Sequence, residues 1–263
     1  MAIREIRTED QPSLVELWHH VFGDPVSYVE EFFCILPEIG SGVAAFENGR
    51  LLGAAYIITA GELCESGQIR RCGYLYAVAV DPAARGRGLG GRLSQAAAAL
   101  GRERGAALIC TLPAEPGLYA WYEKLLGVRC ALYRERYELD SRPFPVWLPI
   151  GAAEYARRRE ALLRGRPHLR LPEAALRLEE ANCRAFGGGL YALGDGLAAA
   201  YVSDDVTEVR ELLGVEPEAA ASLGAALGTA HVRLWLPANS GEPYLASSPA
   251  DLPPDTVWNL AFD

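Results

Sequence analysis

A glycine-rich loop at residues 85–91 restricts the fold of this chain more than any other feature of its sequence. The loop reads Arg-Gly-Arg-Gly-Leu-Gly-Gly, and it lies between an apolar strand at 74–80 and a helix that starts near residue 88. Glycines let successive backbone N–H groups turn into one hollow, and such a hollow at a helix N-terminus binds anions. The order of strand, turn, arginine, glycines and helix therefore favours a bound phosphate over a glycine turn without a ligand.

Two better-known phosphate loops do not fit these residues. The Gly-Lys-Ser/Thr ending of a Walker loop is missing. The Rossmann spacing can be imposed on Gly86, Gly88 and Gly91, but the acidic residue expected about twenty positions later is missing, and the loop follows a late strand. The sequence therefore indicates a phosphate loop of another kind.

The first 140 residues alternate between strand-like and helix-like patterns. Helices are expected after a cap at 8–10 and at 27–36, 88–104 and 119–126. Strands are expected at 3–7, 42–46, 51–58, 63–68, 70–80, 106–112 and 128–139. This alternation predicts an α+β fold, in which a mixed sheet carries helices on its faces.

The segment at 141–150 contains three prolines and is the predicted domain boundary, because proline removes hydrogen-bond donors and breaks helices. We expect a first domain at 1–140, a linker at 141–150 and a second domain at 151–263. In the second domain the pattern predicts helices at 152–163 and 172–186, followed by strands.

A faint internal repeat links the two parts. Leu-Gly-Ala-Ala-Tyr-Ile at 52–57 is similar to Leu-Ala-Ala-Ala-Tyr-Val at 197–202, and Leu-Pro-Ala occurs at both 112–114 and 236–238. The interval between these landmarks is shorter in the second half, where little loop is expected between a strand at 206–213 and a helix at 217–227. Duplication and chance similarity in alanine-rich sequence both remain open.

Composition excludes several classes of function. Among 263 residues, 34 are acidic and 25 basic, so the net charge of −9 argues against nonspecific nucleic-acid or anionic-membrane binding. The six cysteines form no CxxC pair, and the four histidines lack metal-ligand spacing, so no metal is expected. A charged N-terminus and the absence of an apolar run of about 18 residues predict a cytoplasmic protein.

At the loop, the sequence resembles the GCN5-related N-acetyltransferases (GNAT), whose signature Arg/Gln-x-x-Gly-x-Gly/Ala is met by Arg85, Gly88 and Gly90. The preceding Val-Ala-Val-Asp-Pro at 78–82 is also typical of that family. The resemblance covers about residues 3–140. It implies a GNAT acyl-CoA N-acyltransferase fold, in which acetyl-CoA lies between splayed strands at 74–80 and 106–112. The implied acetyl-CoA-binding residues are Val78, Ala79, Val80, Arg85, Gly86, Arg87, Gly88, Leu89, Gly90 and Gly91.

A second landmark is Trp121-Tyr122 followed by Gly127-Val128. It is similar to the family's Tyr-x-x-x-Gly-Phe stretch, with one extra residue before the glycine and valine in place of phenylalanine. The resemblance implies that Tyr122 protonates the departing CoA thiolate, a role that suits a phenol in a dry cleft. Tyr119 is the alternative donor, and packing alone is the alternative role.

The general base is left unassigned. Many family members carry a glutamate on the strand at 74–80, where this chain has Tyr74 and Tyr76. Glu115, Glu30 and Glu31 are candidates that would act through water, and each is also consistent with a solvated surface charge.

The two-part layout resembles the Eis-type acetyltransferases, which join an active GNAT domain to a degenerate copy and a sterol-carrier-like domain. The chain ends at Asp263, so we do not expect it to contain the third domain. In that family the terminal carboxylate reaches the active site, and whether Asp263 does so is left open.

The resemblance implies an N-acetyltransferase that moves an acetyl group from acetyl-CoA to a primary amine by direct attack, with a tyrosine as general acid. A catalytically silent acyl-CoA sensor is the alternative, and a nicotinamide or nucleotide binder is a third. A small amine, an aminoglycoside, a polyamine or a peptide all remain open as the acceptor, and the acidic charge favours cationic amines. The oligomeric state cannot be read from the sequence.

Overall fold

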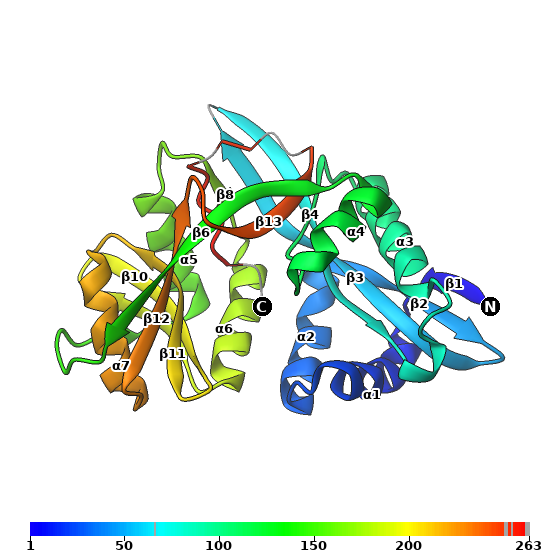
Figure 1. Ribbon diagram of the computed structural model, residues 1–263, viewed down its shortest axis with the longest axis horizontal. Helices are drawn as coiled ribbons and strands as arrows, with labels where there is room; N and C mark the ends of the chain where they lie inside the picture. Colours follow the sequence, from blue (N-terminus) through cyan, green and yellow to red (C-terminus); the bar gives the residue numbers. More distant parts are fainter. Residues whose placement is uncertain (66, 250–251, 254, 261–263) are drawn as a thin grey trace. The chain divides into compact units, whose positions relative to one another are not determined.

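The computed structural model describes residues 1–65, 67–249, 252–253 and 255–260. The chain divides into two compact units, which are described separately (Figure 1). The first unit comprises Met1–Glu62, Ile69–Ala131 and Leu245–Asp251. The second comprises Leu63–Gln68, Leu132–Tyr244 and Leu252–Asp263.

The first unit is a mixed sheet in the order β1-β2-β3-β4-β5-β13, in which β4 and β5 run parallel and the last strand is the end of β13 (Glu242–Ser248). Its elements are β1 (Ala2–Glu5), α1 (Gln11–Phe22), α2 (Val26–Ile39), β2 (Gly40–Glu47), β3 (Arg50–Glu65), β4 (Gln68–Val80), α3 (Leu89–Glu103), β5 (Leu108–Thr111) and α4 (Pro116–Leu126). The short helices at Thr8–Asp10 and Pro82–Ala84 are of the 3-10 type.

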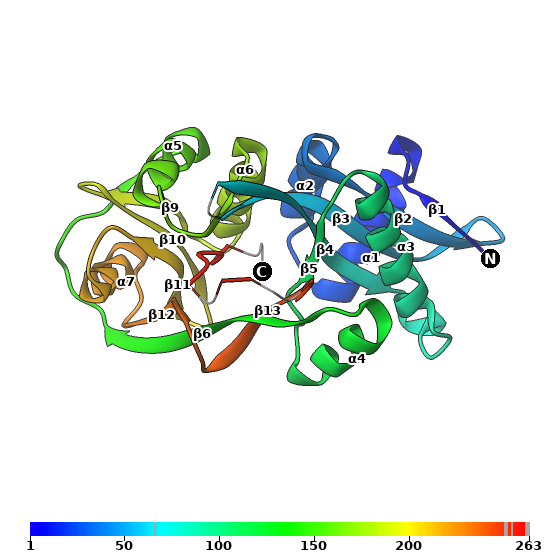
Figure 2. The ribbon, with the colours of Figure 1, turned by 90° about the horizontal axis from the view of Figure 1, so that it is seen from above.

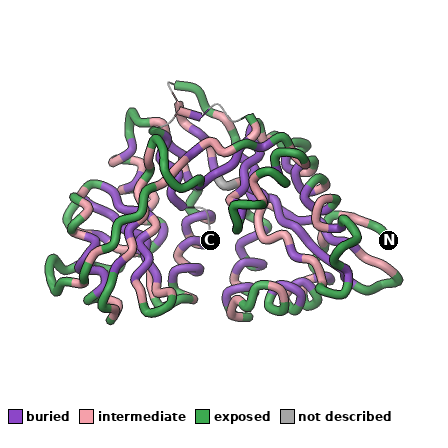
Figure 3. Tube along the Cα trace, in the orientation of Figure 1, coloured by how far each residue is buried: buried purple, intermediate pink, exposed green. Residues whose placement is uncertain are grey.

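Helices cover both faces of this first sheet. Ile57 and Leu75 join an apolar cluster with α3 and α4, whereas Tyr56 and Tyr76 contact Trp18 of α1. Because side chains alternate between the faces of a strand, α3 and α4 must cover one face, and α1 must lie on the other (Figure 1). The strand β3 is buried along most of its length between these layers (Figure 3).

The second unit has the sheet order β6-β12-β11-β10-β9-β7, and its parallel pair is β11 and β12. Its elements are β6 (Arg129–Asp140), β7 (Leu148–Pro149), α5 (Ala152–Leu162), β8 (His168–Arg170), α6 (Glu173–Ala185), β9 (Gly189–Leu193), β10 (Gly196–Ser203), β11 (Val206–Leu213), a 3-10 turn (Pro217–Ala220), α7 (Ala221–Leu227), β12 (His231–Ala238) and β13 (Glu242–Ser248).

The second sheet repeats the topology of the first. In both units an edge strand is followed by helices, then by three strands that are neighbours in the sheet, then by a helix and a strand parallel to the one before it. The strands and the last helix are β1-β2-β3-β4-α3-β5 in the first unit and β7-β9-β10-β11-α7-β12 in the second. The similar segments at 52–57 and 197–202 lie in β3 and β10, which hold equivalent places. The predicted fold class, an α+β sheet followed by a second copy of the same kind, is confirmed.

The last strand of each sheet comes from an unexpected part of the chain. β6 continues from the first unit into the second, where Tyr133–Asp140 pairs antiparallel with β12. β13 does the reverse, and its residues Ala246–Ser248 pair antiparallel with Ile109–Thr111 of β5 (Figure 2). The boundary between the two units falls between Ala131 and Leu132, inside β6. The linker predicted at 141–150 comes later, after the end of that strand. Each sheet is thus completed by a strand that the other half of the sequence supplies.

The units differ in loop length and in strand length. Only residues 214–216 separate β11 from the 3-10 turn Pro217–Ala220, which leads directly into α7, so the short loop expected there is confirmed. In addition, β3 and β4 are 16 and 13 residues long, whereas β10 and β11 have 8 residues each. The separate strand expected at 63–68 is wrong, since β3 continues unbroken to Glu65 and β4 begins at Gln68.

Candidate functional site

The parallel strands β4 and β5 separate before β4 ends. β4 pairs with β5 from Cys72 to Tyr74, although β4 continues to Val80. Ala77 has a left-handed φ of 45°, which costs energy for a residue with a Cβ and turns the strand at that point. Thr111 at the end of β5 donates a hydrogen bond of 3.2 Å to the carbonyl of Leu75. Beyond that contact, the backbone of β4 at Val78 and Val80 lies outside the ladder with β5.

The glycine loop follows directly from this strand end. The Asp81 carboxylate accepts a bond of 2.8 Å from the Ala83 amide, which fixes the turn. Gly86 and Gly88 have φ of 77° and 67°, and a Cβ added at either would meet no atom within 4 Å. Their backbone angles therefore require glycine, and the space above them is open.

The helix α3 presents its first amides at this loop. The amide of Arg92 makes a helical bond of 3.3 Å to Gly88 O. The preceding amides at Leu89, Gly90 and Gly91 belong to the first helical turn, where no carbonyl four residues earlier is available to them. These amides and the positive end of the helix dipole make an anion-binding cradle.

Two arginines flank the cradle in different ways. Arg85 donates from Nε to Val80 O at 3.3 Å, which ties the loop to the end of β4. Arg87 pairs with Glu47 at 3.0 Å on an exposed surface, and this ion pair lowers the pKa of the Glu47 carboxyl. A bound anion would compete with Glu47 for Arg87.

Tyr122 lies on α4 inside the apolar cluster that includes Leu89 and Leu93. Burial raises the pKa of the Tyr122 hydroxyl, and the nearby hydroxyls of Thr111 and Ser94 partly oppose this rise. Thr111 is the residue at which β4 and β5 part. The structure therefore brings Tyr122 to the end of β5, beside the start of α3, while Tyr119 lies half-buried one turn earlier.

The sequence analysis did not identify a polar group on β4, which lies on the face opposite to the apolar cluster with α3 and α4. The Tyr76 hydroxyl lies 2.9 Å from the Tyr28 hydroxyl, and Trp18 Nε1 donates to Asp24 Oδ2 at 2.7 Å. The pKa of Tyr76 is raised by burial first, and also by Tyr28 and by the Asp24 charge. Tyr76 is therefore neutral, and it cannot replace the strand carboxylate as a base. Asp24 carried no sequence signal, because its charge acts on Tyr76 only in the folded chain.

The predicted base candidates are scattered on the surface. Glu115 is the exposed residue before α4, while Glu30 is exposed and Glu31 half-buried on α2. Asp263 lies outside the described residues. Within the described part of the chain, no group of three or more His, Cys, Asp or Glu residues is arranged to hold a metal ion, and none of the helices has the length and apolar character to span a membrane.

Comparison with protein-family models matches residues 2–123 to the acetyltransferase (GNAT) domain. This part of the chain is a GNAT acetyltransferase domain. The loop at 85–91, the strand β4 and most of α4 all lie inside the matched range. A comparison with curated proteins finds no match.

Solved structures extend the similarity beyond the GNAT domain. A conserved protein from Enterococcus faecalis V583, described as a probable N-acyltransferase, has a TM-score of 0.68 at 12% identity, covering 94% of this chain and 72% of its own. A GCN5-related N-acetyltransferase from Kribbella flavida gives 0.63 at 21% identity, with 95% and 73% covered. Eis1 from Mycobacterium abscessus gives 0.61 at 17% identity, with 93% and 73% covered. At these identities the matches show a shared fold that includes the second unit.

Proposed function

We propose that the first domain catalyses N-acetylation, moving an acetyl group from acetyl-CoA to a primary amine by direct attack. The observation that carries the proposal is the loop at 85–91, where left-handed Gly86 and Gly88 leave open space beside the first amides of α3. The cradle fits a pyrophosphate, since it offers backbone donors, a helix dipole and two arginines. We also propose the domain limits expected from the sequence, in which a linker at 141–150 separates the two domains.

The end of β4 supplies the next part of the site. The backbone of Val78 and Val80, which lies outside the ladder with β5, suits the amides of a pantetheine arm, which would add to it as a strand does. The acetyl carbonyl would then lie near the amide of Val78. That amide would donate to the oxyanion as the tetrahedral intermediate forms.

The chemical step is balanced by three proton transfers. The neutral amine attacks the acetyl carbonyl and forms the C–N bond, and the C–S bond breaks when the intermediate collapses. Tyr122 gives its proton to the leaving thiolate, the ammonium of the intermediate loses one proton to water, and the Tyr122 phenolate takes a proton back from water before the next turnover. The raised pKa of Tyr122 supports this role, because the hydroxyl stays protonated at neutral pH.

A thermal-melting experiment tests the cofactor site. Acetyl-CoA at about 100 times its Kd should stabilise the wild type by about 2.7 kcal/mol. Gly88→Trp fills the open space above the loop and should lose this response. Gly23→Trp is the matched control, because Gly23 also has a left-handed φ, 80°, and open space around its Cβ position.

A second variant covers the case in which Gly88→Trp fails to fold. Gly90 lies within α3, and its added Cβ would only touch Val80 at 3.8 Å, so Gly90→Leu should fold. It should bind acetyl-CoA more weakly. A wild type that does not respond to saturating acetyl-CoA would overturn the proposal.

A catalytically silent acyl-CoA sensor is the second candidate. It is favoured by Tyr74 and Tyr76, which stand where many GNAT enzymes carry a strand carboxylate. Thioester cleavage measured with a panel of primary amines separates the two. Turnover with any amine supports the enzyme, and acetyl-CoA binding without turnover across the panel supports the sensor. Competition of CoA against NAD and ATP tests the nucleotide binder.

A further inference from the structure

An ion pair engages one arginine of the glycine loop. Arg87 donates two hydrogen bonds to the Glu47 carboxylate, at 3.0 and 3.4 Å. The pair lowers the pKa of the Glu47 carboxyl and raises the pKa of the Arg87 guanidinium, so both groups are charged at neutral pH. Glu47 is the last residue of β2, and the proposed acetyl transfer gives it no role.

The position of Glu47 is fixed by its hairpin and does not depend on the loop. The turn that joins β2 to β3 has left-handed φ angles of 52° at Asn48 and 79° at Gly49, as a tight two-residue hairpin requires. Directly after the turn, Arg50 pairs with Asp81 at 2.6 Å. This second ion pair ties the start of β3 to the end of β4, so the Glu47 carboxylate stays in place when its own partner moves.

The Arg87 side chain, in contrast, has room to change its partner. Its exposed fraction is 49%, and a Cβ added at Gly86 or Gly88, on either side of it, would meet no atom within 4 Å. An exposed ion pair contributes little to stability, because water screens both charges. Exchange of the carboxylate for another anion is therefore easy.

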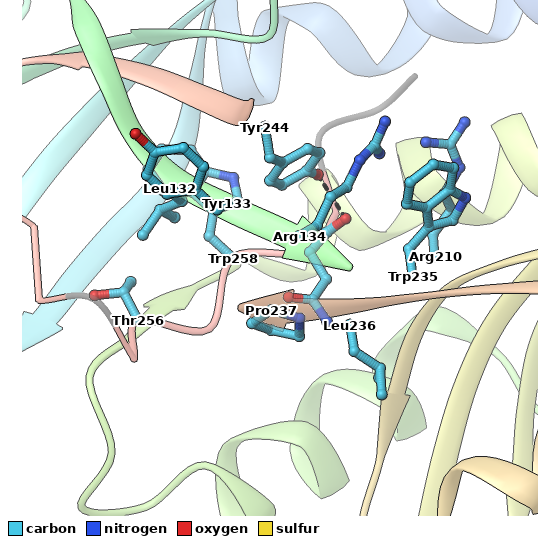
Figure 4. Close-up of a pocket in the computed structure, with 11 residues that line it drawn as sticks. Leu132, Tyr133, Arg134, Arg210, Trp235, Leu236, Pro237, Tyr244, Thr256 and Trp258 are labelled. Atoms are coloured by element: carbon cyan, nitrogen blue, oxygen red, sulfur yellow. Dashed lines mark hydrogen bonds between the residues drawn. The ribbon is translucent and has the colours of Figure 1, made fainter. Parts of the chain in front are cut away.

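Arg134 in the second unit shows how an arginine that is fixed by its surroundings differs. Its guanidinium lies over the rings of Trp235 and Tyr244, at 3.8 and 4.8 Å from their centroids (Figure 4). The pocket beside these rings has room for about one water molecule, which is too little for a phosphate. Arg134 is therefore part of the packing of its unit, whereas Arg87 lies in open space beside an anion cradle.

A phosphate on the cradle would compete with Glu47 for the same donors. Arg87 comes two residues before Leu89, the first residue of α3, whose first amides face the cradle. A guanidinium binds a phosphate through paired N–H donors, as it binds a carboxylate. A phosphate monoester carries up to about two negative charges at neutral pH, against one on Glu47, so it is the stronger partner.

We propose that Arg87 exchanges Glu47 for a phosphate group of the bound cofactor, and that Glu47 thereby sets the affinity of the site. The inference rests on the proposed acetyl-CoA site. Before the cofactor binds, Glu47 occupies the guanidinium, and the phosphate must break this pair. As CoA leaves, Glu47 takes Arg87 back. Glu47 therefore weakens cofactor binding, and its effect is expected mainly in the rate of CoA release.

Isothermal titration calorimetry of the intact chain with CoA tests the exchange. Glu47→Gln keeps the length of the side chain and removes its charge, so CoA should bind about two to five times more tightly than to the wild type. Arg87→Gln should bind CoA more weakly than the wild type. In the Arg87→Gln background, Glu47→Gln should bring no gain, because Glu47 acts through that arginine.

Glu5→Gln is the matched control. Glu5 also forms an ion pair on an exposed surface, with Arg104 after the far end of α3. The 15 residues of that helix place Arg104 roughly 22 Å from the loop. The substitution removes the same charge and should leave CoA affinity unchanged. A gain equal to that of Glu47→Gln would reveal a general effect of net charge and overturn the proposal.

A second ligand, 3′-dephospho-CoA, identifies the phosphate that Arg87 binds. It lacks the 3′-phosphate and keeps the pyrophosphate. A gain from Glu47→Gln that is confined to CoA assigns Arg87 to the 3′-phosphate. An equal gain with both ligands assigns it to the pyrophosphate. Either result supports the exchange.

Other outcomes count against the exchange. If Glu47→Gln melts like the wild type and binds CoA equally or more weakly, the ion pair only holds the loop in shape. If the gain persists in full in the Arg87→Gln background, Glu47 acts without that arginine. A wild type that binds neither acetyl-CoA nor CoA would instead overturn the proposed function, so the two failures are distinguishable.

Discussion

The chemistry available to Tyr122 is set by its surroundings on α4. It is buried among apolar side chains, with the hydroxyls of Thr111 and Ser94 as its polar neighbours. A buried phenol resists ionisation, so it can give a proton but does not accept one near neutral pH. The same reasoning excludes Tyr76 as a base.

Replacing the Tyr122 hydroxyl tests this role. Tyr122→Phe should lower kcat by about 100-fold or more, the usual loss when a general acid is removed. Its acetyl-CoA-dependent melting shift should remain, because the ring still packs. Steady-state rates with a saturating amine measure the effect, and Tyr119→Phe is the control. If kcat falls in Tyr119→Phe and not in Tyr122→Phe, Tyr119 is the general acid.

The pH dependence gives a second readout of the same residue. Tyr122 works in its protonated form, and burial raises its pKa above the ordinary value of about 10. Its contribution to kcat is therefore complete at neutral pH and is lost only as the pH rises above about 10. This basic limb should be present in the wild type and missing in Tyr122→Phe. A limb that persists in the variant would belong to another group.

Secondary-structure elements in the second unit are joined by a buried ion pair. Arg159 of α5 and Glu211 of β11 are 1% and 0% exposed, and Arg159 Nε lies 3.0 Å from Glu211 Oε2. Tyr155 donates to the same carboxylate at 2.9 Å, and Arg159 also donates to Leu169 O at 2.6 Å. The network fixes α5 and β8 relative to β11.

Breaking this network should destabilise the second unit strongly. Arg159→Leu leaves the Glu211 carboxylate buried without its partner, and such a loss costs about 3–5 kcal/mol. Arg158→Leu removes the neighbouring surface pair with Glu154 and should cost about 0–1 kcal/mol. Urea unfolding of the two variants compares the costs. Equal effects would contradict the assigned importance of the buried pair.

Local sequence patterns predicted the elements that carry the phosphate loop. The expected helix at 88–104 and strand at 70–80 correspond to α3 (Leu89–Glu103) and β4 (Gln68–Val80), because glycines and apolar periodicity act locally. Strand β13 was missed, since Glu242–Ser248 has no clear alternation and gains its partner, β5, only in the folded chain. The contact between the hydroxyls of Tyr28 and Tyr76 was missed for the same reason, because these residues are distant in sequence.

At the scale of the whole molecule, the exchanged strands decide which pieces can fold. A chain cut within 141–150 separates β13 from β5 and β12 from β6. Fragment 1–140 would expose the edge of β5, whose residues Leu108–Thr111 are all buried. The proline-rich segment therefore has the composition of a linker, but we do not expect the parts of the chain on either side of it to be stable alone.

Expression of fragments tests this dependence. Fragments 1–140 and 141–263 should each be insoluble or melt without cooperativity when produced alone. Co-expressed, they should copurify and melt cooperatively, because each supplies the strand that the other lacks. Solubility, copurification and thermal melting are the measurements. A fragment 1–140 that melts cooperatively at the temperature of the intact chain would contradict the prediction.

The exchange of β6 and β13 also bears on why the two halves of the gene stay together. Ordinarily, a copy without chemistry can be trimmed by deletion at no cost to its twin. Here a deletion of the second half also takes Ala246–Ser248 away from β5, so the loss is felt first by the half that was kept. Selection on one copy therefore preserves the reading frame of both, whichever of them carries the activity.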